Sequence, residues 1–135
     1  PIKVYVAGLY LDKKNNSSNE IIDSTSPKKV VLHFLREGSK SKITDGWETG
    51  FKNNCGDKCE DQKPLVKRFL DMMVDMQSGD RMAFAVFSDH LQVTVKSKDQ
   101  GAIFDPYFPK TVMSVFIGKV PPNPELKEGV LGISP

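Results

Sequence analysis

Residues 81–96 read RMAFAVFSDHLQVTVK, and this stretch decides the fold class. Two runs rich in Val, Phe and Leu, 81–87 and 91–96, are separated by only three polar residues. Such a short polar connection between two strand-like runs predicts a β-hairpin, and therefore an antiparallel sheet. Residues 101–105 (GAIFD) are expected to add a short third strand.

Two further strands are expected upstream of this hairpin. Residues 3–11 (KVYVAGLYL) are apolar at nearly every position, which is typical of an interior strand covered on both faces. Residues 29–36 (KVVLHFLR) also carry apolar side chains on both faces, so His33 is expected to be a polar residue of the core. Residues 12–27 are rich in Asn, Asp and Ser, which predicts a flexible loop.

The remaining segments show the periodicity of helices. Ile43, Trp47 and Phe51 recur every four residues and would share one helix stripe. We expect helices over residues 37–54, 64–76, 106–118 and 125–131. Strands and helices are thus grouped rather than alternating, which predicts an α+β fold with an antiparallel sheet.

Composition narrows the function classes. The 135 residues, 39% of them hydrophobic, are expected to form a single domain over 1–135. The net charge is only +2 and the basic residues are scattered, so no nucleic-acid partner is expected. The longest apolar run, 4–11, is far shorter than the roughly 20 residues of a membrane span, so none is expected.

The sequence lacks the motifs of common catalytic and metal sites. Two His residues and one Cys-x-x-x-Cys pair predict no metal site, and no glycine-rich phosphate loop or G-x-S-x-G is found, so no cofactor is expected. His90 falls in the hairpin turn and is expected to be solvated. These patterns alone identify no catalytic residue.

Cys55 and Cys59 lie between two expected helices. A short loop brings Cα atoms within the roughly 4.4–6.8 Å that a disulfide requires, so the two bridge if the protein resides in an oxidising compartment. The alternative is two ordinary thiols.

Large aromatic residues lie on the helix stripes, among them Trp47, Phe51 and Phe116. Such stripes are usually core. They would instead wall an apolar ligand cleft if a few polar groups, such as Tyr5 and Asn54, lie beside them. Both interpretations fit the composition.

Several strings together resemble the bacterial branch of the chalcone isomerase-like family. They are KVYVAGLYL, ITDGWETGFKNN, SGDRMAFAVF and VFIGKVPPNPELKEGVLG, and the resemblance runs from Lys3 to Gly132. It implies an open-faced β-sandwich of chalcone isomerase type, an antiparallel sheet with helices layered on one face and a ligand cleft between them. It also implies that the N-terminal strands of the family precede Pro1.

The resemblance allows the catalytic positions of the plant enzymes, which close a chalcone to a flavanone, to be compared with this sequence. The family's arginine would precede Pro1. The Thr of the first strand falls on Tyr5, which keeps a hydroxyl, and the catalytic Tyr falls on Trp47, which has no phenol. The Lys one turn later falls on Gly50 and the last contact Thr on Val115, so both polar groups are lost.

The resemblance therefore implies a non-catalytic protein that binds an apolar or amphipathic small molecule such as a fatty acid. The expected ligand-binding residues are Tyr5, Trp47, Phe51, Asn54, Val115 and Phe116. The alternative is an isomerase of the chalcone–flavanone type acting on an unknown substrate, with Tyr5 and Asn54 polarising a carbonyl. A third possibility is a cleft filled by side chains.

The resemblance also bears on compartment and assembly. Bacterial relatives typically carry an export signal, so we expect a periplasmic or secreted protein in which a bridge between Cys55 and Cys59 makes sense. Strands missing ahead of Pro1 would expose a sheet edge and favour a homodimer.

Overall fold

The computed structural model describes residues 4–118, and within them five strands form one antiparallel sheet. Each strand pairs with its neighbours in chain order. The strands are β1 (Tyr5–Leu11), β2 (Lys28–Phe34), β3 (Arg81–Val86), β4 (His90–Val95) and β5 (Lys98–Phe104). The predicted hairpin is β3–β4, and the predicted antiparallel sheet is confirmed.

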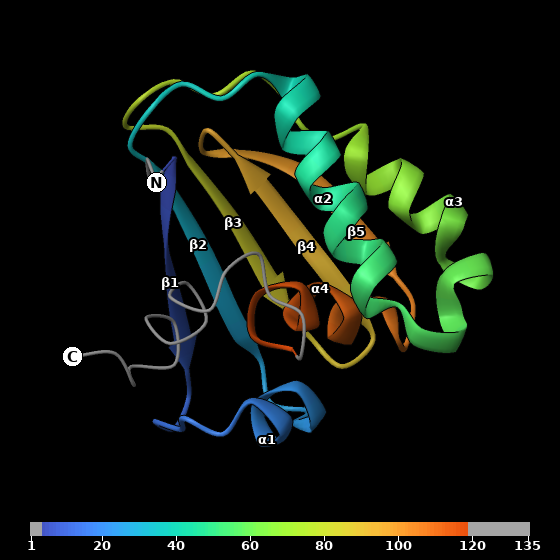
Figure 1. Ribbon diagram of the computed structural model, residues 1–135. Coiled ribbons are helices and arrows are strands. Elements are labelled where there is room, and N and C mark those ends of the chain that lie inside the picture. The colour runs from blue at the N-terminus through green and yellow to red at the C-terminus, as the bar shows by residue number, and fades with distance from the viewer. Residues whose placement is uncertain (1–3, 119–135) are drawn as a thin grey trace.

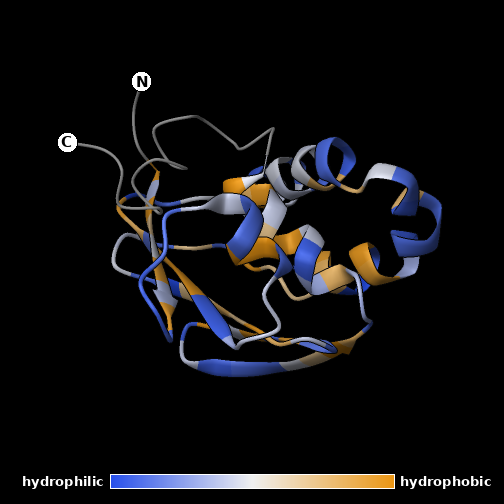
Figure 2. Cartoon of the chain, turned by 90° about the horizontal axis from the view of Figure 1, so that it is seen from below, coloured by the Kyte–Doolittle hydropathy of each residue, from blue (hydrophilic) through white to orange (hydrophobic). Residues whose placement is uncertain are grey.

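The helices gather on one side of this sheet, as Figures 1 and 2 show. They are α1 (Ser18–Asp23), α2 (Lys40–Asn54), α3 (Cys59–Leu70) and α4 (Phe108–Ile117), and a 3₁₀ turn, Gly56–Lys58, precedes α3. The expected α+β architecture, with helices layered on one face of an antiparallel sheet, is confirmed.

The core lies between the sheet and the helix layer. Along β3 and β4 every second side chain is buried, as the alternation of a one-sided sheet requires. The inward-facing set is Met82, Phe84, Val86, Leu91, Val93 and Val95. α4 is buried on nearly all sides, because it packs against β3, β4, α1 and α2.

The first two strands differ from their predicted environment. β1 was expected to be an interior strand, but it lies at an edge of the sheet, where Val6 is 43% and Tyr10 60% exposed. In β2 the side chains of Val30 and Phe34 are buried, whereas His33 is only partly buried on the other face. Both predictions of two covered faces are wrong, because the helix layer covers one face of the sheet.

The predicted loop over residues 12–27 contains a short helix, α1. The Ser17 hydroxyl accepts a hydrogen bond from the Glu20 amide, and Asn15 in turn holds the Ser17 amide. This S-x-x-E spacing is a capping signature that the polar composition obscured. Ile21 fixes the helix by burying its side chain in the core.

Helix boundaries also differ from the prediction. α2 begins after Ser39, whose hydroxyl accepts from the Lys42 amide, and not at residue 37. α3 ends at Leu70, well before the expected Met76. Met76 exchanges two backbone hydrogen bonds with Gly38, so this pairing takes the place of further helix. The helix predicted over 125–131 lies outside the described residues.

His90 was expected to be solvated in a turn, and this prediction is wrong. It is the first residue of β4 and only partly exposed. Its ring lies between those of Phe87 and Phe104, with centroids 4.4 Å and 4.8 Å away, and Nδ1 is 2.7 Å from an Asp89 carboxylate oxygen.

Candidate functional site

Trp47 occupies the centre of the layer between helices and sheet. It extends from the buried face of α2 and is only 6% exposed. Its ring centroid lies 4.7 Å from that of Phe69 on α3, 5.3 Å from that of Phe84 on β3 and 5.4 Å from that of Phe116 on α4. One indole thus contacts three different elements.

Phe51, one turn further along α2, extends the same cluster. Its ring stacks on Trp47 at 5.5 Å and on Phe108 at 5.4 Å, and it meets the edge of Phe69 at 5.3 Å. The structure therefore brings the predicted apolar wall residues together. Among the described residues, these rings pack directly against one another across the layer.

Gly50 on α2 faces Val115 on α4. A Cβ atom built at position 50 would lie 2.7 Å from Cγ1 of Val115, which is closer than real carbon atoms come. Where the resemblance places a catalytic lysine, any side chain would require Val115 to move. The replacement by glycine is thus a packing requirement of this helix pair.

Asn54 ends α2 and is held by the helix itself. Its side-chain amide donates to the Gly50 carbonyl at 2.8 Å. Its Oδ1 lies beside Gly118, at the end of α4, 3.0 Å from the position a Cβ atom would take there. Asn54 therefore links the C-terminal ends of α2 and α4.

Tyr5 is the first residue of strand β1. Its ring is 5.7 Å from that of Phe34, and Phe34 and Ile43 both lie beside Gly38, ahead of the first turns of α2. Burial raises the pKa of the Tyr5 phenol, so the group remains a neutral hydroxyl at physiological pH. It is only partly exposed, at the edge strand β1.

Tyr5 is the first residue of β1 and Asn54 the last of α2, and Figure 1 shows that the start of β1 and the end of α2 lie well apart. Polarising one carbonyl would require both groups within hydrogen-bond distance of the same oxygen. The structure does not place these two residues for that role.

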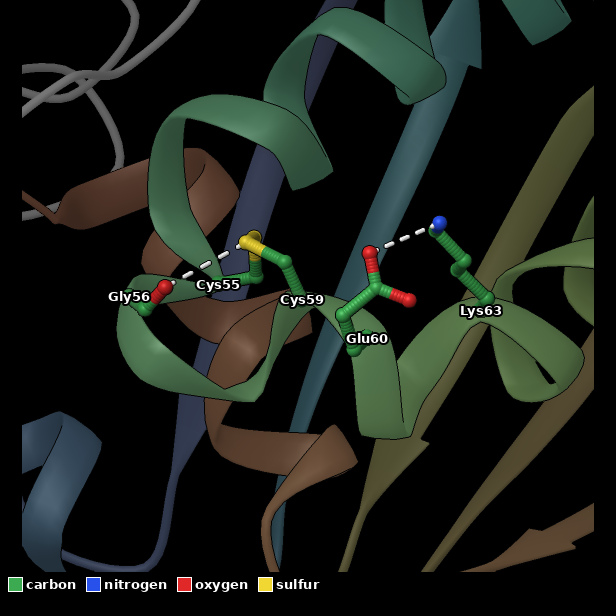
Figure 3. A network of polar contacts seen from close by, with 5 residues as sticks. All are labelled: Cys55, Gly56, Cys59, Glu60 and Lys63. Carbon is green, nitrogen blue, oxygen red and sulfur yellow. Dashed lines mark hydrogen bonds and ion pairs between the residues drawn. A yellow bond between two sulfur atoms is a disulfide. The ribbon is translucent and has the colours of Figure 1, made fainter.

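Cys55 and Cys59 form a disulfide between the end of α2 and the start of α3, with their Cα atoms 5.0 Å apart (Figure 3). The Cys59 sulfur also lies 3.3 Å from the Gly56 carbonyl oxygen. On the following turn of α3, Lys63 and Glu60 form an exposed ion pair at 2.8 Å. The bridge joins the two helices that carry Trp47 and Phe69.

Two of the buried polar residues that the sequence reasoning missed are Gln62, which pairs with the equally buried Thr111, and Lys28. Gln62 on α3 is 2% exposed and donates from Nε2 to Thr111 Oγ1 at 3.0 Å. Within residues 4–118 its Oε1 is the one buried side-chain nitrogen or oxygen without a hydrogen-bond partner. Gln62 is seven residues before the buried Phe69 and therefore lies on the same helix face, which is the sequence signal that could have revealed its burial.

The second is Lys28, the first residue of β2, which is 7% exposed. Its ammonium donates to the Ser24 carbonyl at 2.9 Å. It alternates with Val30 on the inward face, and the period of two was the signal that could have revealed its burial.

Two kinds of site are not found in the described part of the chain. No helix over residues 4–118 has the length and hydropathy needed to cross a membrane. The same residues contain no group of three or more His, Cys, Asp or Glu arranged to hold a metal ion.

Comparison with known proteins extends these observations. A family model described as chalcone isomerase-like matches residues 1–132. Among solved structures, a fatty-acid binding protein of Arabidopsis thaliana is similar with a TM-score of 0.79 and 13% sequence identity, over 96% of this chain and 77% of that one. None of the curated sequences compared with the chain matches it. At this identity the plant structure shows a shared fold.

Proposed function

Since the chain belongs to the chalcone isomerase-like family, we propose that it is a non-catalytic member that binds a fatty acid or a similar amphipathic molecule. The observation that carries the proposal is the apolar layer around Trp47. The plant protein with the same fold is a fatty-acid binding protein, which supports the same ligand class here.

The residues at the enzyme positions argue against cyclisation chemistry. Ring closure of a chalcone depends on charge stabilisation by polar groups aimed at the substrate. Here Trp47 is packed among phenyl rings, and Gly50 and Val115 are in contact. None of the three offers a hydroxyl or a charge to a bound ketone.

An acyl chain that enters between the packed rings must displace side chains, and the core contains residues suited to that change. Five methionines are buried in the core: Met72, Met73, Met76, Met82 and Met113. Methionine is unbranched and flexible, so it repacks around a guest more readily than Leu or Val. We infer that binding proceeds by local repacking.

The single Trp of the sequence supplies a direct test. Titration with decanoate should change the emission of Trp47, because the acyl chain would replace phenyl rings around the indole. Phe51→Leu should weaken the response, whereas Phe104→Leu, which alters a 65% exposed ring on β5, should leave it unchanged.

Native mass spectrometry of the protein purified from cells, with solvent extraction and identification of released molecules, provides the second test. A retained lipid-like molecule at one per chain is the expected result. The proposal would be overturned if the purified protein holds no lipid-like molecule and its Trp47 emission does not change when a panel of fatty acids is added.

The proposal extends to compartment: the protein is bacterial and exported to the periplasm or secreted. The bridge between Cys55 and Cys59 supports this, because disulfides persist in oxidising compartments. Fractionation of the native host, with thiol alkylation before lysis, should find the chain outside the cytoplasm with both cysteines protected.

It also extends to assembly as a homodimer through the sheet edge formed by β1. This edge carries the exposed side chains of Val6 and Tyr10, and exposed edges favour pairing with another chain. Sedimentation velocity should show a dimer that Val6→Lys weakens. A monomer at all concentrations would contradict this part of the proposal.

A further inference from the structure

A small cavity lies away from the aromatic layer, between α1, the end of β3 and the start of α4. Its volume is about 100 Å³. A single water needs only about 10–15 Å³ of such space, so the cavity has room for a carboxylate or phosphate group. Its polar lining consists of Ser24, Thr25, Lys28, Ser88 and Lys110.

Two lysines, Lys28 and Lys110, make this cavity positively charged. Lys28 is 7% exposed, and an ammonium has three N–H donors. One of them donates to the Ser24 carbonyl, and within residues 4–118 the structure shows neither an ion pair nor a second hydrogen bond for it. A buried charge in this state is costly unless a counter-charge accompanies it.

Lys110 adds a second positive charge on the same cavity. Burial lowers the pKa of Lys28, and the like charge of Lys110 lowers it further, while Asp12 acts in the opposite direction. Lys110 forms no ion pair with any residue of the described range 4–118. An anion between the two ammonium groups would relieve both the desolvation and the repulsion.

The nearby helix terminus is already occupied. Asp105 accepts hydrogen bonds from the amides of Tyr107 and Phe108, which cap the start of α4. A bound anion would therefore depend on the two lysines and on the hydroxyl groups of Ser24, Thr25 and Ser88.

We propose that this cavity binds a small oxyanion, a carboxylate, phosphate or sulfate group, between Lys28 and Lys110. The site is independent of the aromatic layer around Trp47. Its ligand is either a free ion or the charged end of a larger molecule, and these two sources share the same chemistry.

The test is calorimetric titration with inorganic phosphate at pH 7 and constant ionic strength. Binding of one phosphate per chain is expected, and Lys110→Gln should weaken it at least about tenfold, since a charge-assisted contact is lost. Lys98→Gln, which removes an exposed lysine from β5, should have no effect. Asp12→Asn should tighten binding, because it removes the competing negative charge.

Lys110 is exposed, so its replacement should leave the fold intact, and circular dichroism checks this. Lys28→Gln provides a second variant, whose phosphate affinity is measured under conditions in which circular dichroism shows that it is folded. Equal affinity in the wild type and in Lys110→Gln would overturn the proposal, as would the absence of saturable binding at millimolar phosphate.

Competition identifies the source of the anion. If decanoate displaces phosphate, and this displacement also depends on Lys110, the site binds the carboxylate of an acyl ligand. If acetate displaces phosphate but decanoate does not, the site binds a free ion. Either result supports the site. Trp47 emission distinguishes this proposal from the one on the aromatic layer. If Lys110→Gln loses phosphate binding but its Trp47 emission still responds to decanoate as in the wild type, the acyl chain binds at the aromatic layer and the oxyanion site is separate from it.

Discussion

Gly50 of α2 and Val115 of α4 meet so closely that a Cβ atom at position 50 would lie 2.7 Å from the valine Cγ1. This contact sets the spacing of the two helices that carry Trp47 and Phe116. It also closes the position at which the resemblance places a charged lysine.

Replacement of Gly50 by alanine should therefore destabilise the fold by about 1–3 kcal/mol through overpacking. Gly46 on the same helix is the matched control, because nothing lies within 4 Å of a Cβ atom there. Gly46→Ala should raise the free energy of unfolding by up to about 1 kcal/mol, as is usual for this replacement within a helix. Urea unfolding measures both, and equal effects at the two positions would contradict the close contact.

The bridge between Cys55 and Cys59 should stabilise the protein modestly, since the two residues are only four apart in sequence. Loop-closure entropy for so short a segment corresponds to about 2 kcal/mol. Reduction, or the C55A/C59A double variant, should lower the free energy of unfolding by that amount. Identical urea midpoints with and without reductant would show that the bridge adds nothing.

Gln62 and Thr111 should respond in opposite directions to the loss of their shared hydrogen bond. Thr111→Val leaves the buried Nε2 of Gln62 without an acceptor and should cost about 1–3 kcal/mol. Gln62→Met removes the unpaired Oε1, while the Thr111 hydroxyl still lies 3.4 Å from the Tyr107 carbonyl. We expect this variant to be neutral or slightly stabilised. Equal losses in both variants would refute the assignment of Oε1 as unsatisfied.

Asp80 should make stability depend on pH in acid. The Gln77 amide donates to Oδ2 at 2.7 Å, and this hydrogen bond, with the charge of Lys96, lowers the pKa of the carboxyl below its usual 3.8. A lowered pKa in the folded state stabilises the protein above about pH 4, and the contribution is lost as the pH falls through the folded value.

Asp80→Asn should accordingly flatten the loss of stability below pH 4, measured as thermal midpoint against pH. Asp45→Asn, at an exposed position on α2, is the control and should leave the profile unchanged. Parallel profiles for the wild type and Asp80→Asn would refute the role of this carboxylate.

Local patterns predicted much of the architecture. The alternation of residues 91–96 indicated that β4 has one buried face, and the four-residue recurrence of Trp47 and Phe51 identified the inner face of α2. These patterns are reliable because they repeat the geometry of a strand or a helix over several residues. The short helix α1 was missed, since six polar-flanked residues contain too few repeats.

The candidate site was less predictable. The apolar type of Trp47 and Phe116 was clear from the sequence, but whether their rings enclose a cleft or fill it depends on how closely α2 and α4 approach. The position of β1 was misjudged for a similar reason. An apolar strand looks the same in sequence whether one face or both are covered.

The sequence by itself determined the five strands, the three longer helices α2, α3 and α4 and the antiparallel class of the sheet, because these follow from neighbours along the chain. Only the tertiary structure decided that Gly50 meets Val115, that Trp47 touches three elements, and that Lys28 and Lys110 share one cavity. These contacts join segments far apart in sequence, and their distances are set by the packing of whole helices on the sheet.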